Sequence, residues 1–144
     1  MSTNIKATSD IQFLATYGTL RDDDNSGAAW TNDFVKDISG AVTGKLVGYR
    51  LFGHSVINYP FATYTGDSND SLVVRLLSWP SKEQFEERIQ AADIIEGDEY
   101  ERRAVEVIVN DEIKHAYIYI SKLASLDNDW KSIPSGDWLE RHLI

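Results

Sequence analysis

The stretch Ala91–Arg103, AADIIEGDEYERR, leads from the end of a predicted helix into a predicted β-hairpin. Within it, Glu96 lies between two isoleucines and a glycine, and most residues after that glycine are charged. Because those later residues already make the segment hydrophilic, Glu96 is not needed for solvation. The helix, the hairpin and this isolated carboxylate are the features on which the predicted fold and function depend.

The residues before this stretch predict a helix over Lys82–Ala92. Ser81 and Gln84 have the spacing of a capping box, in which each residue satisfies a free amide of the first turn. Phe85, Ile89 and Ala92 recur on one face of this helix. We expect its C-terminal end to point toward Glu96.

Residues 103–110 (RAVEVIVN) and 115–121 (HAYIYIS) alternate apolar with polar positions on either side of DEIK (111–114), which predicts a hairpin with one covered face. Further strands are predicted upstream in four apolar segments: IQFLAT (11–16), GAVTGKLVGYRLF (40–52), INYPFATYT (57–65) and SLVVRLLSW (71–79). The second is long and rich in glycine, so we expect it to bend or to carry a bulge.

Two shorter helical segments are also predicted. Residues 28–38 (AAWTNDFVKDI) have a weak helical spacing of Trp30, Phe34 and Ile38, and about two helical turns follow Ser135 as a candidate cap. Many strands with one well-defined helix predict an α+β fold, a small closed or curled mixed β-barrel with a few flanking helices. We expect one domain over residues 1–144.

Composition limits the possible functions. With 144 residues, 42% of them hydrophobic, the chain can enclose a core and a small pocket. It contains no run of about 20 apolar residues, as a membrane span needs, and residues 1–10 are too polar for a signal peptide, so we expect a soluble, cytoplasmic protein. The absence of cysteine excludes disulfides and thiolate chemistry, and a net charge of -9 disfavours nucleic acid and anionic lipid as partners.

Neither a zinc site nor a serine hydrolase is indicated. His54, His115 and His142 lie far apart and lack the spacing of zinc ligands. The segment GHSV (53–56) lacks the second glycine of a nucleophile elbow.

The acidic segment Asp22–Asp33, DDDNSGAAWTND, has two interpretations. Its residues 22, 24, 26, 27 and 33 match positions 1, 3, 5, 6 and 12 of a calcium-binding loop. However, the residues before it predict a strand and a turn rather than a helix, and Asp33 is shorter than the usual bidentate glutamate. We expect a solvated acidic loop, with calcium binding as the alternative.

The segment YGTLR (17–21) follows the first predicted strand. A strand that ends in such a turn can direct successive backbone N–H groups into a concavity, where they bind a carboxylate or a developing oxyanion. A tight turn without a binding role is the alternative interpretation.

Taken in order, these pieces resemble the γ-glutamylcyclotransferase superfamily, in its AIG2-like branch. The matching segments are YGTLR, then GKLVGYRLFG with NYPFA, then DIIEGDEYERRAVEV, then AYIY (116–119) and finally SGDW (135–138). Two positions depart from the family pattern: Val74-Arg75-Leu76 replace a stretch that often contains glycine, and Ala92 replaces a leucine.

The resemblance implies a mixed domain of helices and strands around a closed, twisted β-barrel, in agreement with the α+β prediction. It also implies roles for particular residues. Glu96 would be the catalytic carboxylate, and Tyr17, Gly18, Thr19 and Leu20 would hold the glutamyl end of the substrate. Tyr59, Tyr100 and Tyr119 would be pocket or supporting positions. Arg102 could clamp a carboxylate, but we favour pairing with a nearby acidic residue at the surface.

The implied reaction needs no cofactor or metal, because the substrate's own α-amine attacks its γ-carbonyl and closes 5-oxoproline. One carboxylate with a raised pKa can move the protons, and we expect Ile94 and Ile95 to desolvate Glu96. The expected partner is a small γ-glutamyl compound. The alternative is a non-catalytic protein that uses the same pocket to bind a small molecule or peptide, which Arg75 and residues 22–24 leave open.

Overall fold

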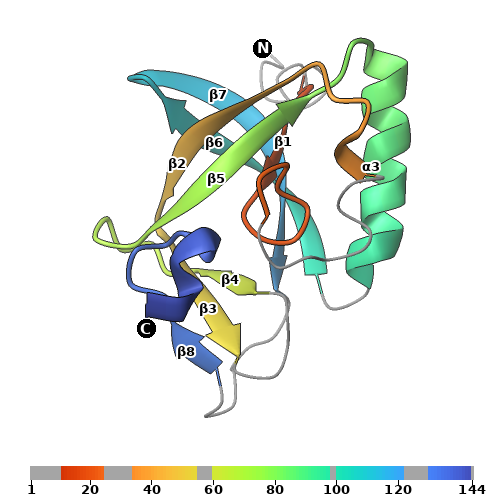
Figure 1. Cartoon of the computed structure of the whole chain (residues 1–144). Helices are drawn as coiled ribbons and strands as arrows, with labels where there is room; N and C mark the ends of the chain where they lie inside the picture. Colours follow the sequence, from red (N-terminus) through yellow and green to blue (C-terminus); the bar gives the residue numbers. More distant parts are fainter. Residues whose placement is uncertain (1–10, 25–33, 55–59, 98–99, 122–129, 144) are drawn as a thin grey trace.

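The computed structural model describes residues 11–24, 34–54, 60–97, 100–121 and 130–143. Five strands close into a mixed barrel in the order β1-β5-β2-β6-β7, and three short strands form a second sheet in the order β4-β3-β8. Helix α3 runs along one side of the barrel, and the C-terminal 3-10 helix η2 lies near the second sheet (Figure 1). The predicted α+β class with a closed barrel is confirmed.

The elements have the following bounds: β1 (Leu14–Thr16), β2 (Gly40–Val47), β3 (Tyr49–His54), β4 (Phe61–Tyr64), β5 (Ser71–Ser78), α3 (Lys82–Glu96), β6 (Tyr100–Val109), β7 (Glu112–Ser121), β8 (Trp130–Ser132) and η2 (Trp138–Leu143). Strand β1 is shorter than the predicted 11–16, but its three residues are all buried. It pairs antiparallel with β5 and parallel with β7, and thereby closes the barrel. Its last residue leads directly into Tyr17.

The prediction of one long strand over 40–52 is wrong, because the chain breaks at Gly48. This glycine has a φ of +91°, a left-handed conformation that other residues rarely adopt. Its N–H donates to Asp70 O at 2.8 Å and its carbonyl accepts from Thr65 N at 2.8 Å. As a result, β2 belongs to the barrel and β3 to the second sheet.

The β6–β7 hairpin is confirmed, but its turn is tighter than predicted. Val109 pairs with Glu112, so the loop contains only Asn110 and Asp111. Both have positive φ, 50° and 69°, as a type I′ turn requires, and Asn and Asp tolerate this conformation best after glycine. Residues 112–114 of the predicted DEIK turn therefore belong to β7.

Helix α3 begins as predicted and ends later. Gln84 N donates to the Ser81 hydroxyl at 3.1 Å, and the buried residues are Phe85, Ile89 and Ala92. No glycine or proline interrupts the chain after Ala92, so the helix continues to Glu96 and ends at Gly97 (φ +68°). The described helices include none that is long and apolar enough to span a membrane.

The C-terminal turns form a 3-10 helix whose cap is Asp137 rather than the predicted Ser135. Asp137 Oδ1 accepts from Leu139 N at 3.0 Å inside the helix. The Ser135 hydroxyl accepts instead from Asp137 N at 3.2 Å, two residues before Leu139 and outside the helix. Most of the helix predicted over 28–38 lies outside the described residues, which include only its helical end at Phe34 and Val35.

Gly136 offers a test of how closely the segment before η2 packs against strand β5. A Cβ at this position would lie 2.0 Å from Ser71 O, and its φ is +70°. Gly136→Ala should therefore lower the free energy of unfolding by about 2–5 kcal/mol, from backbone strain plus overpacking. Gly48→Ala is the matched control, since φ is +91° there but the nearest atom lies 3.6 Å away. Equal losses in urea unfolding would contradict the steric explanation.

Candidate active site

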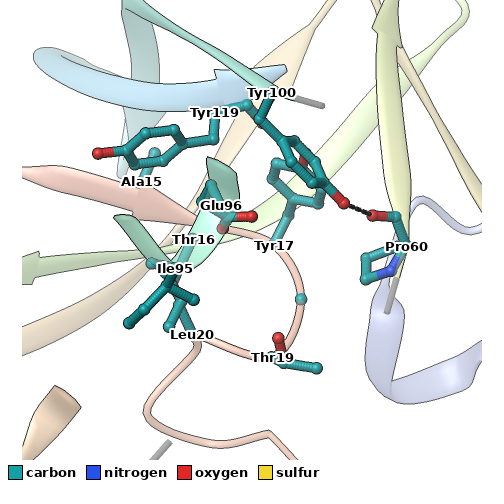
Figure 2. A pocket seen from close by; sticks show the side chains of 11 residues that line it. Ala15, Thr16, Tyr17, Thr19, Leu20, Pro60, Ile95, Glu96, Tyr100 and Tyr119 are labelled. Atoms are coloured by element: carbon teal, nitrogen blue, oxygen red, sulfur yellow. Dashed lines mark hydrogen bonds between the residues drawn. The ribbon is translucent and has the colours of Figure 1, made fainter. Parts of the chain in front are cut away.

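A cavity of about 310 Å³ opens at the end of β1, between the loop that follows β1, the last turn of α3, and strands β6 and β7. Figure 2 shows its lining: Ala15, Thr16, Tyr17, Gly18, Thr19, Leu20, Pro60, Ile95, Glu96, Tyr100 and Tyr119. Of the predicted site residues, all but Tyr59 line this one cavity, and Tyr59 lies outside the described residues. Sequence analysis did not identify Pro60, although it directly follows Tyr59 in the matched segment NYPFA.

The loop after β1 is held close to the second sheet. Arg21 N donates to Gly18 O at 3.0 Å, which closes a turn over residues 18–21. A Cβ on Gly18 would lie 2.6 Å from Pro60 Cδ, so only glycine fits against the proline ring. The buried Tyr17 hydroxyl donates to the backbone carbonyl of Tyr119.

Among the described residues that line the cavity, only Glu96, the last residue of α3, has a charged side chain. Its carboxylate is directed toward the ring of Tyr17 (Figure 2). Burial raises the pKa of Glu96 to about 7. The partial negative charge at the helix C-terminus acts in the same direction, because it disfavours a carboxylate.

The expected desolvation by Ile94 is wrong, since this residue is 82% exposed and is not among the residues that line the cavity. Ile95 lines the cavity but is itself 43% exposed. Besides Ile95, the residues that share the cavity with Glu96 come from other elements and include Tyr17, Tyr100 and Tyr119. Successive residues of a helix are rotated by about 100°, so Ile94, two positions before Glu96, lies on roughly the opposite side of the helix.

Of the three predicted pocket tyrosines, the two that are described, Tyr100 and Tyr119, use their hydroxyl groups within the protein. Tyr100 Oη donates to Pro60 O at 2.7 Å. Tyr119 Oη lies 2.6 Å from Asp93 Oδ1, and it points away from Glu96 (Figure 2). Their rings therefore form walls of the cavity. The favoured interpretation of Arg102 agrees with its geometry: Nη1 lies 3.2 Å from Asp93 Oδ2 in an exposed ion pair.

The three aspartates after the loop are bonded to other elements, rather than only solvated as expected. Asp22 accepts two hydrogen bonds from Arg75, at 2.8 and 2.9 Å, and Asp23 accepts two from Arg21, at 2.7 and 2.9 Å. Asp24 Oδ1 accepts from the indole of Trp138 at 2.8 Å. Arg75, which belongs to the stretch noted above as a departure from the resembled pattern, thus fastens the loop to β5.

This bonding bears on the calcium interpretation. The carboxylates of Asp22 and Asp24 already have protein partners, and the described residues contain no cluster of three or more His, Asp or Glu that could hold a metal ion. The remaining residues of the calcium pattern, 26, 27 and 33, lie outside the described residues. Calcium binding therefore receives no support from the described part of this loop.

Arg21 is the buried centre of this network, with 2% of its side chain exposed. Besides Asp23, it bonds Asp137 at 2.8 Å and so joins the loop to the start of η2. Burial alone would lower the pKa of Arg21, but the two carboxylates raise it above its ordinary value. The sequence carried no signal for this role, because Asp137 is remote from Arg21 along the chain.

Arg21→Met tests the importance of the buried cation. It should lower the free energy of unfolding by about 3 kcal/mol, since Asp23 and Asp137 would be left without their partner. Arg50→Met is the control, because Arg50 pairs with Asp70 but is 44% exposed, and it should cost less than about 1 kcal/mol. Similar losses for both variants in guanidinium unfolding would refute the distinction.

The raised pKa of Glu96 predicts how stability depends on pH. A carboxyl group with a higher pKa in the folded protein stabilises the fold most below its ordinary pKa of 4.5, and this contribution is lost as the pH rises through about 7. Glu96→Gln carries no charge at any pH. The unfolding free energy of the parent relative to this variant should therefore fall between pH 4.5 and 8, by up to about 3 kcal/mol.

Urea unfolding across this pH range measures the difference. Glu87→Gln, an exposed glutamate on the same helix, should retain the parent's pH dependence. A parent-to-Glu96→Gln difference that is constant with pH would show that Glu96 titrates as an ordinary carboxyl group.

Comparison with known proteins supplies the family. The family model described as "Gamma-glutamyl cyclotransferase, AIG2-like" matches residues 14–140. No curated protein matches the sequence significantly.

Solved structures share the fold at low identity. YkqA of Bacillus subtilis aligns with a TM-score of 0.66 and 20% identity over 92% of this chain, which spans only 41% of YkqA. PH0828 of Pyrococcus horikoshii aligns with a TM-score of 0.58 and 25% identity over 92% of this chain and 93% of its own. An AIG2-like protein of Mus musculus has a TM-score of 0.62 and 16% identity, over 83% of this chain and 82% of its own. The chain belongs to the AIG2-like gamma-glutamyl cyclotransferase family.

Proposed function

We propose that this protein is an enzyme that releases an amine or amino acid from a γ-glutamyl compound by cyclisation of the glutamyl group to 5-oxoproline, with Glu96 as general acid and base. The observation that carries this proposal is the position of Glu96. Its carboxylate has a pKa raised by burial to about 7, and it shares a cavity with the loop Tyr17–Leu20. Family membership supports the same reaction class.

The cavity suits a small substrate. Its volume of about 310 Å³ falls at the lower end of the range for small-molecule sites. Among the described lining residues there is no lysine or arginine, so the α-carboxylate of a glutamyl group has to be bound by neutral donors. Backbone N–H groups of the loop Tyr17–Leu20 are the donors we assign to it, with Thr19 beside them.

The first chemical step is a proton transfer followed by ring closure. Ionised Glu96 takes a proton from the substrate's α-ammonium group, because only the free amine has a lone pair with which to attack. The amine nitrogen then forms a bond to the γ-carbonyl carbon, and the carbonyl oxygen takes up negative charge. No nucleophile from the protein is consumed in this step.

The second step releases the product. The oxyanion re-forms the carbonyl as the bond from carbon to the original amide nitrogen breaks, and protonated Glu96 gives its proton to that nitrogen. After the attack the ring nitrogen carries one proton more than 5-oxoproline holds, and ionised Glu96 relays this second proton to the expelled amine. The products are 5-oxoproline and the amine as its ammonium ion, and Glu96 ends in its ionised form. A pKa near 7 suits both halves of this cycle, since both protonation states are populated near neutral pH.

Binding the substrate in a folded conformation supplies much of the acceleration. Well-oriented intramolecular reactions gain up to about 7–11 kcal/mol from proximity. The protein therefore needs one proton carrier and a shaped cavity.

The decisive experiment incubates the parent, Glu96→Gln and Glu87→Gln with a pool of γ-glutamyl amino acids and γ-glutamyl amines, and measures 5-oxoproline by mass spectrometry. We expect formation by the parent and by Glu87→Gln, and a loss of at least about 100-fold in Glu96→Gln, because the proton carrier is missing. The consumed member of the pool identifies the leaving amine.

Binding without turnover of any pool member would favour the alternative, a non-catalytic binding protein. Undiminished turnover in Glu96→Gln would exclude Glu96 as the acid and base.

A further inference from the structure

Tyr119 makes hydrogen bonds through two different groups, its side-chain hydroxyl and its backbone carbonyl. Its hydroxyl lies 2.6 Å from Asp93 Oδ1 and 3.2 Å from Ile89 O, both on helix α3. Its backbone carbonyl accepts the hydrogen bond from the Tyr17 hydroxyl. One residue of β7 thus bonds to the helix that carries Glu96 and to the residue that Glu96 faces.

Among the described residues, few other contacts support the last turn of α3. The buried positions of the helix are Phe85, Ile89 and Ala92, and after Ala92 the next residues include Ile94, which is 82% exposed. The final carbonyl groups of a helix have no partners within the helix, so its last turn frays unless it is held by other contacts. Apolar packing therefore holds this helix only to one turn before Glu96.

Asp93 is the attachment point of that last turn. It lies three residues before Glu96, so the two lie on neighbouring positions of one helix face. Its backbone carbonyl accepts from the N–H of Gly97, the residue that ends the helix. Its carboxylate accepts from Tyr119 at one oxygen and from Arg102, 3.2 Å away, at the other.

The bond between Tyr119 and Asp93 is the more sheltered of these two contacts. Tyr119 is 4% exposed, whereas the side chain of Arg102 is 36% exposed. Burial, followed by the bond to Asp93, raises the pKa of Tyr119, so its hydroxyl remains a donor at every ordinary pH. The Asp93 side chain is 45% exposed, so this bond is sheltered on the Tyr119 side only. A hydrogen bond to an ionised carboxylate is still stronger than one between neutral groups.

We propose that Tyr119 is a positioning residue, whose hydroxyl bond to Asp93 holds the last turn of α3 so that Glu96 stays inside the cavity and facing Tyr17. Its consequence for catalysis rests on the function proposed above, whereas its consequence for the position of Glu96 does not. Among the described residues, the ionisable groups that share the cavity with Glu96 are Tyr17 after β1, Tyr100 on β6 and Tyr119 on β7. Asp93 on the same helix and Arg102 on β6 form an ion pair next to them.

Tyr119→Phe tests this proposal, because phenylalanine keeps the ring and the backbone carbonyl but removes the hydroxyl. The titration of Glu96 is followed by NMR of protein labelled with ¹³C in the glutamate carboxyl groups, with Glu96→Gln identifying the signal. Glu96 is partly buried, and it should become more exposed to water once the helix end loosens, so its apparent pKa should fall by about one unit or more from about 7. Tyr49→Phe, which removes a buried hydroxyl that interacts with Arg103 outside this cavity, should leave that pKa unchanged. An unchanged titration of Glu96 in folded Tyr119→Phe overturns the proposal.

A second pair of backgrounds separates this bond from general destabilisation. In Asp93→Asn the side-chain oxygen can still accept from Tyr119, so adding Tyr119→Phe should again lower the pKa of Glu96. In Asp93→Leu the carboxylate acceptor is gone and only Ile89 O, at 3.2 Å and one turn earlier on the helix, remains, so adding Tyr119→Phe should cause a much smaller change. Equal effects of Tyr119→Phe in both backgrounds would also overturn the proposal, whether or not the protein turns over a γ-glutamyl compound.

With a substrate in hand, the same variant gives a kinetic readout. A misplaced Glu96 affects proton transfer more than binding, so kcat should fall about 10- to 100-fold while KM changes little. The lower limb of the kcat/KM pH profile should move to lower pH together with the NMR titration. A fall confined to KM would contradict a positioning role.

Discussion

The pairing of β1 with β5 on one side and with β7 on the other is the constraint on which the site depends. Leu14 is opposite Leu77 of β5 and Tyr117 of β7, so the three buried residues of strand β1 close the barrel. The chain therefore leaves β1 at the end of the barrel, where the hydroxyl of Tyr17 reaches the carbonyl of Tyr119. The position of the loop follows from closure of the barrel, and the cavity forms where this loop meets the end of α3.

Electrostatic contacts then divide the acidic residues into two groups. The aspartates at 22–24 neutralise Arg75 and the buried Arg21 or accept from Trp138, and they anchor the loop to β5 and to η2. Glu96 has a different environment: among the described residues that line the cavity there is no cation, and burial raises its pKa. An acidic chain thus uses most of these carboxylates for structure and leaves one in a state suited to proton transfer.

Local signals predicted much of the fold because their causes are local. The Ser81 cap and the buried face of α3 depend on residues three or four positions apart, and the β6–β7 hairpin depends on alternation within each strand. The errors have a different origin. The break at Gly48 is decided by bonds to Asp70 and Thr65, and the β-rich residues on either side gave no indication that they belong to different sheets.

The sequence by itself determined most element types, the α+β class and the set of residues that resemble a known family, because these depend on periodicity and on the order of motifs. From the residues alone a closed barrel and a curled sheet were both possible, and only the resemblance implied closure. It did not determine which group desolvates Glu96, why three aspartates adjoin the loop, or where the hydroxyl of Tyr119 points. Those features depend on contacts such as Arg21 with Asp137 and Tyr119 with Asp93, which join residues 116 and 26 positions apart. Only the tertiary structure brings such pairs together, because burial and hydrogen bonding act through space and not along the chain.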